Sequence, residues 1–248
     1  MENKNYKFTD DWFSHNIPTW DKLLDVHIKQ NKRQINSVLE IGCYEGKASM
    51  YLADNWLKKG TKYQVVDTFQ GSESESGMKR HIDKLKEDDD FIYKNFVNNV
   101  EQHPDIEWKV LRGVSQCALP ILWAEGNTYD LIYIDASHKS DDTFVDAWFA
   151  HRMLNEGGIM IFDDYLWKDE TNPNDLNHSP QFGIEAFVEL NALYYNLLFQ
   201  GYQIGLYRLS EAEILDKVEK MKEMELNQKW VPEQKPLQMP TTIKGTFG

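Results

Sequence analysis

Three aspartates and one histidine stand where two apolar segments of the chain end. Asp135 and His138 follow the first segment, and Asp163 and Asp164 follow the second. Carboxylates brought this close repel one another unless a cation lies between them. Hard carboxylate oxygens, with a single histidine and no cysteine nearby, select magnesium or a similar ion rather than zinc. The sequence therefore predicts a divalent metal ion, most simply magnesium, at this cluster.

His138 lies three residues after Asp135 and offers a base beside the expected metal ion. Such an ion can hold two neighbouring hydroxyl groups of a substrate and lower the pKa of one of them. An imidazole titrates near neutral pH, so we expect His138 to take the proton of that hydroxyl. Two alternatives stay open: His138 caps the next helix or binds a backbone carbonyl, and Asp163 and Asp164 form a solvated turn or cap.

The segments that end at these residues belong to a repeating pattern of strands and helices. Apolar, β-rich segments alternate four times with segments of helical period, which predicts a doubly wound parallel sheet in an α/β protein. Two more β-like segments, 194–199 and 202–209, are separated by two residues and predict an antiparallel hairpin. The expected fold is a seven-stranded, mostly parallel sheet. Its first five strands are expected at residues 35–41, 63–66, 106–111, 130–134 and 159–162.

We expect three parts along the chain. Residues 1–34 have helical spacing interrupted by Pro18, which predicts two short helices acting as a lid or cap. Residues 35–209 hold the sheet, and residues 210–248 hold a helix that opens with a capping box, followed by a tail. Within the middle part, the polar stretch 71–87 is interpreted mainly as a mobile loop.

A turn with two glycines follows the first expected strand, from Glu40 to Gly46. In an open parallel sheet, ligands bind beyond the carboxyl ends of the strands, where the strand order reverses. Gly42 allows a tight turn close to a ligand, and Gly46 allows close packing where the next helix starts. A dinucleotide site requires a glycine at the place of Tyr44. Tyr44 and the acidic Glu45 instead suit a cationic sulfonium.

Asp67 closes the second expected strand and is placed to accept hydrogen bonds from a ribose diol. The alternatives are plain structural roles. The spacing of Gly42 and Gly46 also occurs in chance turns, and an aspartate at this place can serve as a helix cap or turn residue.

The turn resembles motif I of the class I S-adenosylmethionine-dependent methyltransferases, and the final hairpin resembles the last two strands of their fold. With the aspartates and the D-x-x-H spacing, the closest resemblance is to the magnesium-dependent macrocin- and mycinamicin-type sugar O-methyltransferases. A more distant one is to catechol O-methyltransferase. The segments 66–71 and 113–115 also resemble the sugar enzymes, so the likeness covers roughly residues 36–209.

This resemblance implies roles for the residues of the acidic cluster. Asp135, Asp163 and Asp164 are implied to be the metal ligands. His138 is implied to be the general base, and together with Asp135 it makes up the catalytic set.

The resemblance also implies a cofactor site. Val114 departs from the pattern, because the related enzymes commonly carry an acidic residue there, so adenine is expected beside Ser115 and Phe69 instead. The implied cofactor-binding residues are Glu40, Gly42, Tyr44, Gly46, Asp67, Thr68, Phe69, Ser115 and Asp135.

The sequence therefore predicts an S-adenosylmethionine-dependent O-methyltransferase that acts on a small-molecule hydroxyl, most simply that of a sugar or a glycosylated metabolite. One alternative is a nicotinamide-dependent oxidoreductase, which the bulky Tyr44 and the lack of a Tyr-x-x-x-Lys pair oppose. The other is a non-catalytic nucleoside-binding module that keeps the fold.

The composition of the chain limits its partners. Among 248 residues, 40 are acidic and 27 basic, and the net charge of −13 repels nucleic acid. No apolar run is long enough to cross a bilayer and the N-terminus is too polar for a signal peptide, so we expect a cytoplasmic protein without membrane contact. Cys43 and Cys117 lack metal or redox spacing and are interpreted as free thiols. Apolar faces on the terminal helices leave a homo-oligomer open.

Overall fold

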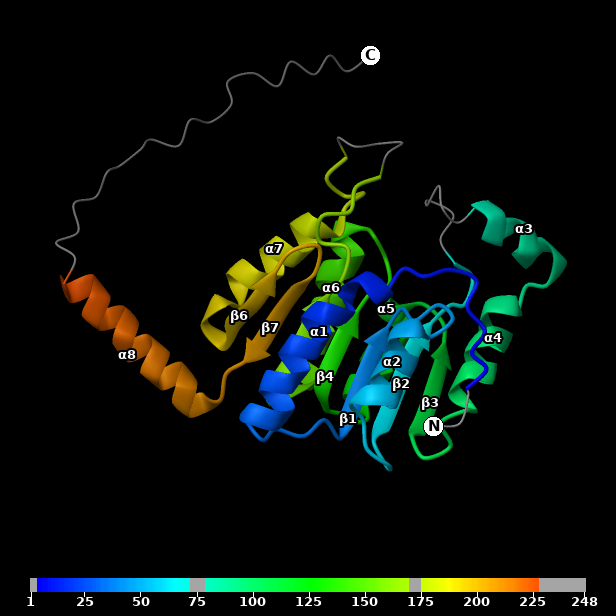
Figure 1. Cartoon of the computed structure of the whole chain (residues 1–248). Helices are drawn as coiled ribbons and strands as arrows, with labels where there is room; N and C mark the ends of the chain where they lie inside the picture. The colour runs from blue at the N-terminus through cyan, green and yellow to red at the C-terminus, as the bar shows by residue number, and fades with distance from the viewer. Residues whose placement is uncertain (1–3, 72–78, 170–174, 228–248) are drawn as a thin grey trace, which may run out of the picture. The chain divides into compact units, whose positions relative to one another are not determined.

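One mixed sheet of seven strands forms the centre of the protein (Figure 1). The computed structural model describes residues 4–71, 79–169 and 175–227. The strands are β1 (Ser37–Ile41), β2 (Lys62–Asp67), β3 (Glu107–Arg112), β4 (Tyr129–Ile134), β5 (Leu154–Phe162), β6 (Tyr195–Gln200) and β7 (Ile204–Arg208). Their order is β3-β2-β1-β4-β5-β7-β6. β1 to β5 are parallel, and β7 is antiparallel to both β5 and β6. The predicted sheet and its C-terminal hairpin are confirmed.

Helices cover both faces of the sheet, as a doubly wound sheet requires. On one face pack α1 (Ile17–Leu24), α2 (Lys47–Asn55) and α4 (Phe91–Val100), and on the other α5 (Ser115–Ala124), α6 (Ser140–Met153) and α7 (Pro180–Leu190). Successive side chains of a strand point to opposite faces. In β4, Leu131 and Tyr133 accordingly enter the first core cluster, whereas Ile132 and Ile134 enter the second. Both clusters consist of fully or nearly fully buried side chains.

The N-terminal helix α1 is part of the core on one face. Trp20 and Leu24 are fully buried. The Trp20 ring stands edge-on to the ring of Tyr133 in β4, with 5.0 Å between centroids, and its indole nitrogen donates to Gln203 beside β7 at 2.8 Å. Two short elements flank α1, a 3-10 turn at Ser14–Asn16 and a π-helical turn at Asp25–Gln30. The segment before β1 therefore contacts both the centre and the C-terminal part of the sheet.

One expectation about the loops is wrong in part. The polar stretch 71–87 was interpreted mainly as a loop, but Lys79–Glu87 forms the helix α3; residues 72–78 lie outside the described residues. The stretch is mostly charged, which hides its helical period, although Leu85 packs against the core. A second short turn, Ala192–Tyr194, links α7 to β6.

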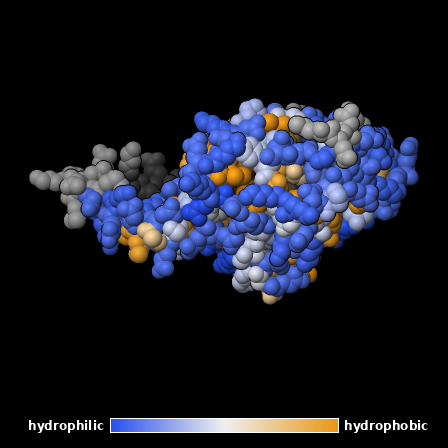
Figure 2. Space-filling view, turned by 60° about the horizontal axis from the view of Figure 1, so that its bottom comes forward, coloured by the Kyte–Doolittle hydropathy of each residue, from blue (hydrophilic) through white to orange (hydrophobic). Residues whose placement is uncertain are grey.

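The chain divides into two compact units at Ser210. The second unit contains the helix α8 (Glu211–Asn227), whose acidic residues Glu211 and Glu213 suit a helix N-terminus. The surface seen in Figure 2 is mostly hydrophilic, with hydrophobic residues in small groups, as the charge of the chain predicts. Across the described residues, we find no helix with both the length and the apolar composition needed to span a bilayer.

Gly42 brings the turn after β1 into contact with the end of β4. The chain takes the left-handed conformation there, with φ +82°, and a Cβ atom would lie 1.9 Å from the backbone oxygen of Asp135. Backbone hydrogen bonds fix both sides of this contact, from Asp135 to the oxygen of Ile41 at 2.7 Å and from Gly42 to that of Val66 at 2.8 Å. The strand ends that carry the candidate chemistry therefore meet at a place that only glycine fits.

We expect Gly42→Ala to destabilise the protein more than Gly60→Ala. Both glycines have φ near +80°, so both variants lose roughly 1–2 kcal/mol to left-handed strain. Only at Gly42 does the new methyl group meet other atoms, whereas Gly60 has none within 4 Å. Overpacking should add roughly 1–3 kcal/mol at Gly42. Urea denaturation of the two variants measures this difference, and equal losses would contradict the packing role of Gly42.

Candidate active site

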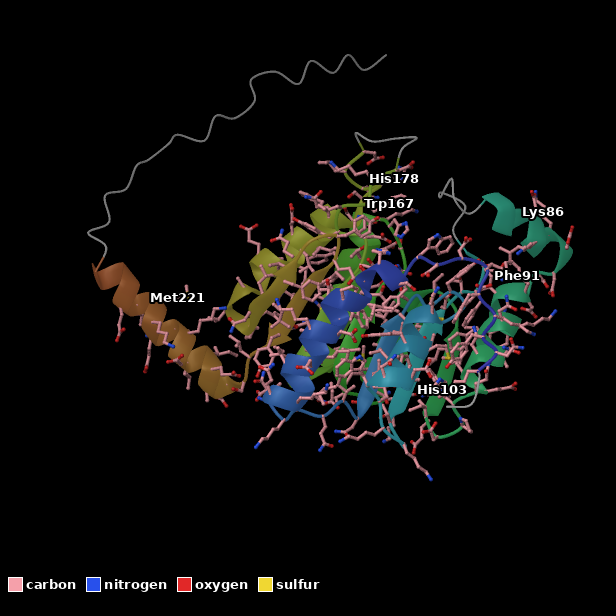
Figure 3. The ribbon with its side chains drawn as sticks, viewed as in Figure 1. Lys86, Phe91, His103, Trp167, His178 and Met221 are labelled. Carbon is pink, nitrogen blue, oxygen red and sulfur yellow. The ribbon has the colours of Figure 1, made fainter. Side chains whose placement is uncertain are left out.

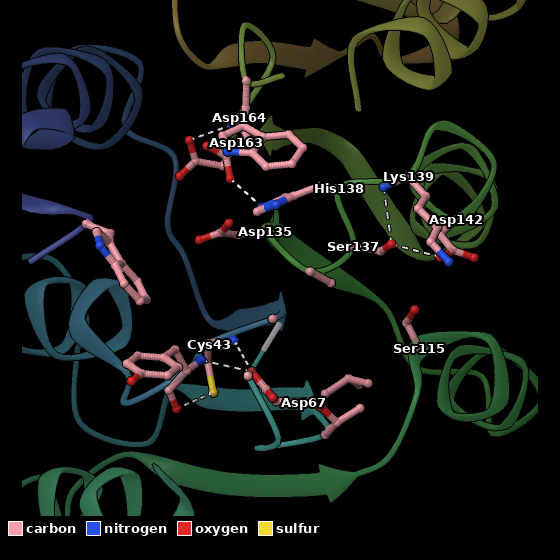
Figure 4. Close-up of a pocket in the computed structure, with 18 of the residues that line it drawn as sticks. Cys43, Asp67, Ser115, Asp135, Ser137, His138, Lys139, Asp142, Asp163 and Asp164 are labelled. Atoms are coloured by element: carbon pink, nitrogen blue, oxygen red, sulfur yellow. Dashed lines mark hydrogen bonds and ion pairs between the residues drawn. The ribbon is translucent and has the colours of Figure 1, made fainter. Parts of the chain in front are cut away.

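A pocket of about 1020 Å³ opens beyond the carboxyl ends of the strands (Figure 4). This is the place where a doubly wound sheet binds its ligands. Most of the residues predicted for the site line it. They are Gly42, Tyr44, Asp67, Thr68, Ser115, Asp135, His138, Asp163 and Asp164.

Asp135, His138 and Asp164 come together at this edge of the sheet. One ligand atom of each lies within 4.8 Å of those of the other two, and His138 Nε2 is 2.8 Å from Asp164 Oδ2. The three side chains point toward one another in Figure 4. Asp164 has the left-handed φ of +55° directly after β5. This conformation is uncommon outside glycine and asparagine-like residues and is typical of functional sites.

Tyr133 links Asp135 to Asp163, a role that the sequence did not reveal. Its hydroxyl is within hydrogen-bonding distance of Oδ2 of Asp163 and of Oδ2 of Asp135, the latter at 3.1 Å. A phenol has one hydrogen to donate. Both contacts can be hydrogen bonds only when one of the two carboxyl groups keeps its proton.

The pKa values of Asp135 and Asp163 agree with a carboxyl group that keeps its proton. Burial, followed by the negative charges of Asp163 and Asp164, raises the pKa of Asp135. Burial and the charge of Asp164 also raise the pKa of Asp163, against hydrogen bonds from Tyr133 and Gln203 that lower it. A bound cation would relieve the repulsion that keeps these protons in place. The donor set therefore fits a hard divalent metal ion.

Asp67 shapes the turn after β1 in addition to lining the pocket. Its Oδ2 accepts hydrogen bonds from the backbone nitrogens of Cys43 at 2.6 Å and Tyr44 at 2.8 Å, and its Oδ1 accepts one from Phe69 at 2.6 Å. A carboxylate has about four acceptor positions, which leaves about one for a ligand. Tyr44, at φ +53°, is held facing the pocket by these bonds.

Three residues predicted for cofactor binding lie behind the pocket and not in its lining. Glu40 is buried and accepts hydrogen bonds from Ser49 and from the Tyr63 hydroxyl. Phe69 is fully buried among aromatic rings. At Gly46 a Cβ atom would lie 2.8 Å from the ring of Phe96. Of the two residues expected beside adenine, Ser115 lines the pocket and Phe69 does not.

The interpretation of Glu45 as a partner for a cationic sulfonium is wrong. Its side chain is 1% exposed and points away from the pocket. It accepts hydrogen bonds from the backbone nitrogen of Thr9 at 2.6 Å, from the Thr9 hydroxyl at 2.9 Å and from Asn95 at 2.8 Å. These partners come from the N-terminal segment and from α4, on the side of the turn away from the pocket lining. Glu45 anchors the N-terminal segment.

The anchored N-terminal segment forms one wall of the pocket. Trp12 packs against Tyr44 with 5.1 Å between ring centroids, and His15 meets Tyr202 edge-on at 6.1 Å. Nothing in the sequence reasoning assigned these contacts, since they join residues far apart in the chain. The opposite wall follows β5 and includes Trp167, whose ring is 4.4 Å from that of His138. Trp167 and His178, which both line the pocket, lie at the same end of the sheet (Figure 3).

Gln116 is a further lining residue that sequence reasoning missed. It follows Ser115 in the first turn of α5, and its amide donates to Asp142 Oδ1 at 2.8 Å. Asp142 also accepts from Ser137 at 2.8 Å. These bonds connect α5 to the loop after β4. The only signal in the sequence was the position of Gln116 after the third expected strand.

Comparisons with known proteins give a family and a fold. The profile of a family described as methyltransferase domain matches residues 39–165, just over half of the chain. An uncharacterized protein of Acanthamoeba polyphaga mimivirus is 23% identical over 158 residues; the match covers 60% of this chain and 64% of that relative. The match therefore spans less than two thirds of the relative's length.

Two solved structures are similar in fold. One is the O-methyltransferase from Bacillus cereus in complex with SAH, with a TM-score of 0.51, 20% identity, and coverage of 78% of this chain and 81% of that one. The other is the O-methyltransferase TomG from Streptomyces achromogenes, involved in tomaymycin synthesis and solved with SAM. Its TM-score is 0.52 at 19% identity, with 77% of this chain and 80% of that one covered.

Replacing Glu45 by alanine should release the N-terminal segment from the pocket. The change leaves the donors of Thr9 and Asn95 without their acceptor, which costs roughly 1–3 kcal/mol for a buried group. Hydrogen exchange of the amides around Thr9 should become faster. Glu101→Ala, at an exposed glutamate, is the control. Unchanged protection of Thr9 in Glu45→Ala would contradict the anchoring role.

Glu40 should make the protein less stable as the pH rises. Burial raises the pKa of Glu40 to about 7 in the folded protein, whereas the pKa of a glutamate in an unfolded chain is about 4.3. Between these two pH values the folded state binds more protons than the unfolded state. Stability is therefore greatest below this window and falls through it. In Glu40→Gln this contribution is absent, so its free energy of unfolding relative to wild type should increase from about pH 5 to about pH 8. Urea denaturation at about pH 5 and about pH 8 measures this. The same difference in unfolding free energy between Glu40→Gln and wild type at both pH values would contradict the raised pKa of Glu40.

Proposed function

Because the chain belongs to the methyltransferase-domain family, we propose that it is an S-adenosylmethionine-dependent O-methyltransferase acting on a small-molecule hydroxyl. The observation that carries the proposal is the convergence of Asp135, His138 and Asp164 in a pocket whose other end is formed by the glycine turn after β1. The names of the two similar structures, both O-methyltransferases with bound SAM or SAH, support the reaction and the cofactor.

The cofactor would lie against the ends of β1, β2 and β3. Gly42 and Tyr44 offer backbone and ring contacts there, Asp67 has about one acceptor position for a ribose hydroxyl, and Thr68 and Ser115 offer hydroxyl groups. When bound, S-adenosylmethionine supplies a methyl group on a positively charged sulfur. The pocket, at about 1020 Å³, lies at the upper end of the range for small-molecule sites. It can therefore hold a cofactor and an acceptor together.

A divalent metal ion, most simply magnesium, would be held by Asp135, Asp163 and Asp164. Of these, Asp135 and Asp164 belong with His138 to the group whose ligand atoms lie within 4.8 Å of one another, and Asp163 does not. Two observations support a metal ion here: the carboxylates repel one another, and the single hydroxyl hydrogen of Tyr133 serves both Asp135 and Asp163. When bound, such an ion supplies positive charge that lowers the pKa of a hydroxyl group. The three aspartates come from two neighbouring strand ends, so the sheet orients them before any ligand arrives.

His138 is placed to accept the proton of the acceptor hydroxyl. Its Nε2 lies 2.8 Å from Asp164 Oδ2; a carboxylate accepts hydrogen bonds, so Nε2 becomes an acceptor for the substrate proton once Asp164 turns to a cation. Trp167 covers one side of its ring and restricts the orientation of the imidazole. Holding the acceptor oxygen and the base in one geometry lowers the entropic part of the barrier.

We propose a sugar or a glycosylated metabolite as the acceptor. Aromatic rings from three segments, Trp12, Trp167 and Tyr202, line the pocket, and Trp167 packs against His138 of the acidic cluster. Flat apolar rings pack against the faces of sugar rings, and carboxylates accept the hydrogen bonds of their hydroxyl groups. The pocket offers both kinds of partner at the same place.

Asp135→Asn should abolish methyl transfer while leaving cofactor binding intact. The variant keeps the shape of the side chain and removes a charge of the acidic cluster, so turnover should fall at least about 100-fold. The measurement is a mass-shift assay with S-adenosylmethionine against sugar and catechol libraries, paired with calorimetry of cofactor binding. Asp141→Asn, at a neighbouring acid outside the pocket lining, is the control.

Several outcomes of this assay separate the parts of the proposal. Full activity of Asp135→Asn, or of wild type in excess chelator, would contradict the metal role. Calorimetry that finds nicotinamide binding and no S-adenosylmethionine binding would favour the oxidoreductase. Tight cofactor binding without transfer to any member of the libraries would favour the non-catalytic binding module.

A further inference from the structure

We propose that Gln203, oriented by Trp20, is a positioning residue that fixes the carboxylate of Asp163 for cation binding. This inference rests on the metal part of the proposed function. It assigns a role to the turn between β6 and β7 and to the N-terminal helix α1, neither of which carries a residue of the acidic cluster. The two residues are 183 positions apart in the chain.

The amide of Gln203 has a single orientation. The side chain is buried, with 3% exposed. Its Oε1 accepts a hydrogen bond from the indole nitrogen of Trp20 at 2.8 Å. An indole can only donate, so the oxygen of the amide must face Trp20. The amide nitrogen then faces Asp163 Oδ2, at 2.9 Å. Trp20 thereby makes Gln203 a donor to Asp163 and prevents the flipped arrangement, in which two acceptors would face each other.

The bonds to Asp163 leave it one free direction. Gln203 and Tyr133 both contact Oδ2, and the backbone nitrogen of Asp164 donates to Oδ1 at 2.8 Å. Of about four acceptor positions on a carboxylate, about one remains, on Oδ1. Asp163 can therefore offer a cation a single oxygen in a set direction. Without Gln203 the carboxylate would keep only the contact with Tyr133 on Oδ2 and the bond from Asp164 on Oδ1, so its orientation would be less restricted.

A neutral amide suits this position better than a charged group. A lysine or arginine would neutralise the negative charge that the cation needs, and a glutamate would add to the repulsion among Asp135, Asp163 and Asp164. An amide donor stabilises the ionised carboxylate and leaves the net charge of the cluster unchanged. Groups of this kind around metal ligands typically change metal affinity about 10- to 100-fold when they are replaced.

The test is Mn²⁺ binding to the full chain, followed by electron paramagnetic resonance. Gln203→Met keeps the approximate volume and removes the donor, so the Kd for Mn²⁺ should rise about 10- to 100-fold. Gln200→Met is the matched control, because Gln200 lies in the same hairpin and donates to Tyr165, at 3.2 Å, with no bond to an acid of the cluster. Its Kd should equal that of wild type. The Kd for S-adenosylmethionine should be unchanged in both variants.

Trp20→Phe provides a second, independent variant. It keeps an aromatic ring in the core but removes the donor that orients the amide and part of the ring that packs against Tyr133, so Mn²⁺ binding should weaken in the same direction. The double variant should bind Mn²⁺ no more weakly than Gln203→Met alone, since both changes act through one hydrogen bond to Asp163. If the two substitutions only disturbed the structure, their losses of Mn²⁺ affinity would add in the double variant. If Gln203→Met does not fold, the Trp20→Phe measurement decides.

The outcomes distinguish this inference from the proposed function. If wild type and both variants bind Mn²⁺ equally well, the role of Gln203 is wrong and the metal site stands. If wild type binds no Mn²⁺, the metal part of the proposed function and this inference both fall, while methyl transfer remains open to the mass-shift assay. A selective loss in Gln203→Met and Trp20→Phe supports the inference.

Discussion

The structure depends on one electrostatic constraint, the gathering of Asp135, Asp163 and Asp164 at two neighbouring strand ends. Parallel strands place their carboxyl ends at one edge of the sheet, so these acids cannot separate without unravelling β4 and β5. The protein meets the repulsion with neutral donors and with His138, whose ring is 2.8 Å from Asp164. Both neutral donors, Tyr133 and Gln203, contact Asp163.

Much of this arrangement follows from the sequence, because it depends on short-range pattern. Continuous apolar strands and the alternation with helices predict a doubly wound parallel sheet, and a residue directly after such a strand must lie at the ligand-binding edge. Asp135 and Asp164 could be placed for that reason. The short link at Gln200 and Gly201 likewise required an antiparallel hairpin, although β7 is shorter than the apolar segment suggested and β6 is shifted by one residue.

What the sequence did not reveal depends on the direction of individual side chains and on contacts between distant segments. Glu45 is next to a pocket residue, yet its side chain points to Thr9 and the N-terminal segment. Tyr133 looks like one apolar residue among others in β4. Its hydroxyl contacts Asp135 and Asp163, which becomes visible only when β4 and β5 are placed side by side in three dimensions.

The N-terminal segment and the final hairpin belong to the site because the acidic cluster needs hydrogen-bond donors. Three acids at the end of a sheet need donors, and the parallel strands beside them have already used their backbone groups in the ladder. Beyond the Tyr133 hydroxyl and the backbone nitrogen of Asp164, further donors must come from outside those strands. Trp20 reaches the cluster through Gln203, and Glu45 holds the segment that carries Trp12 to the pocket wall. Elements that lie outside the parallel part of the sheet therefore supply a donor for its acids and a wall of its pocket.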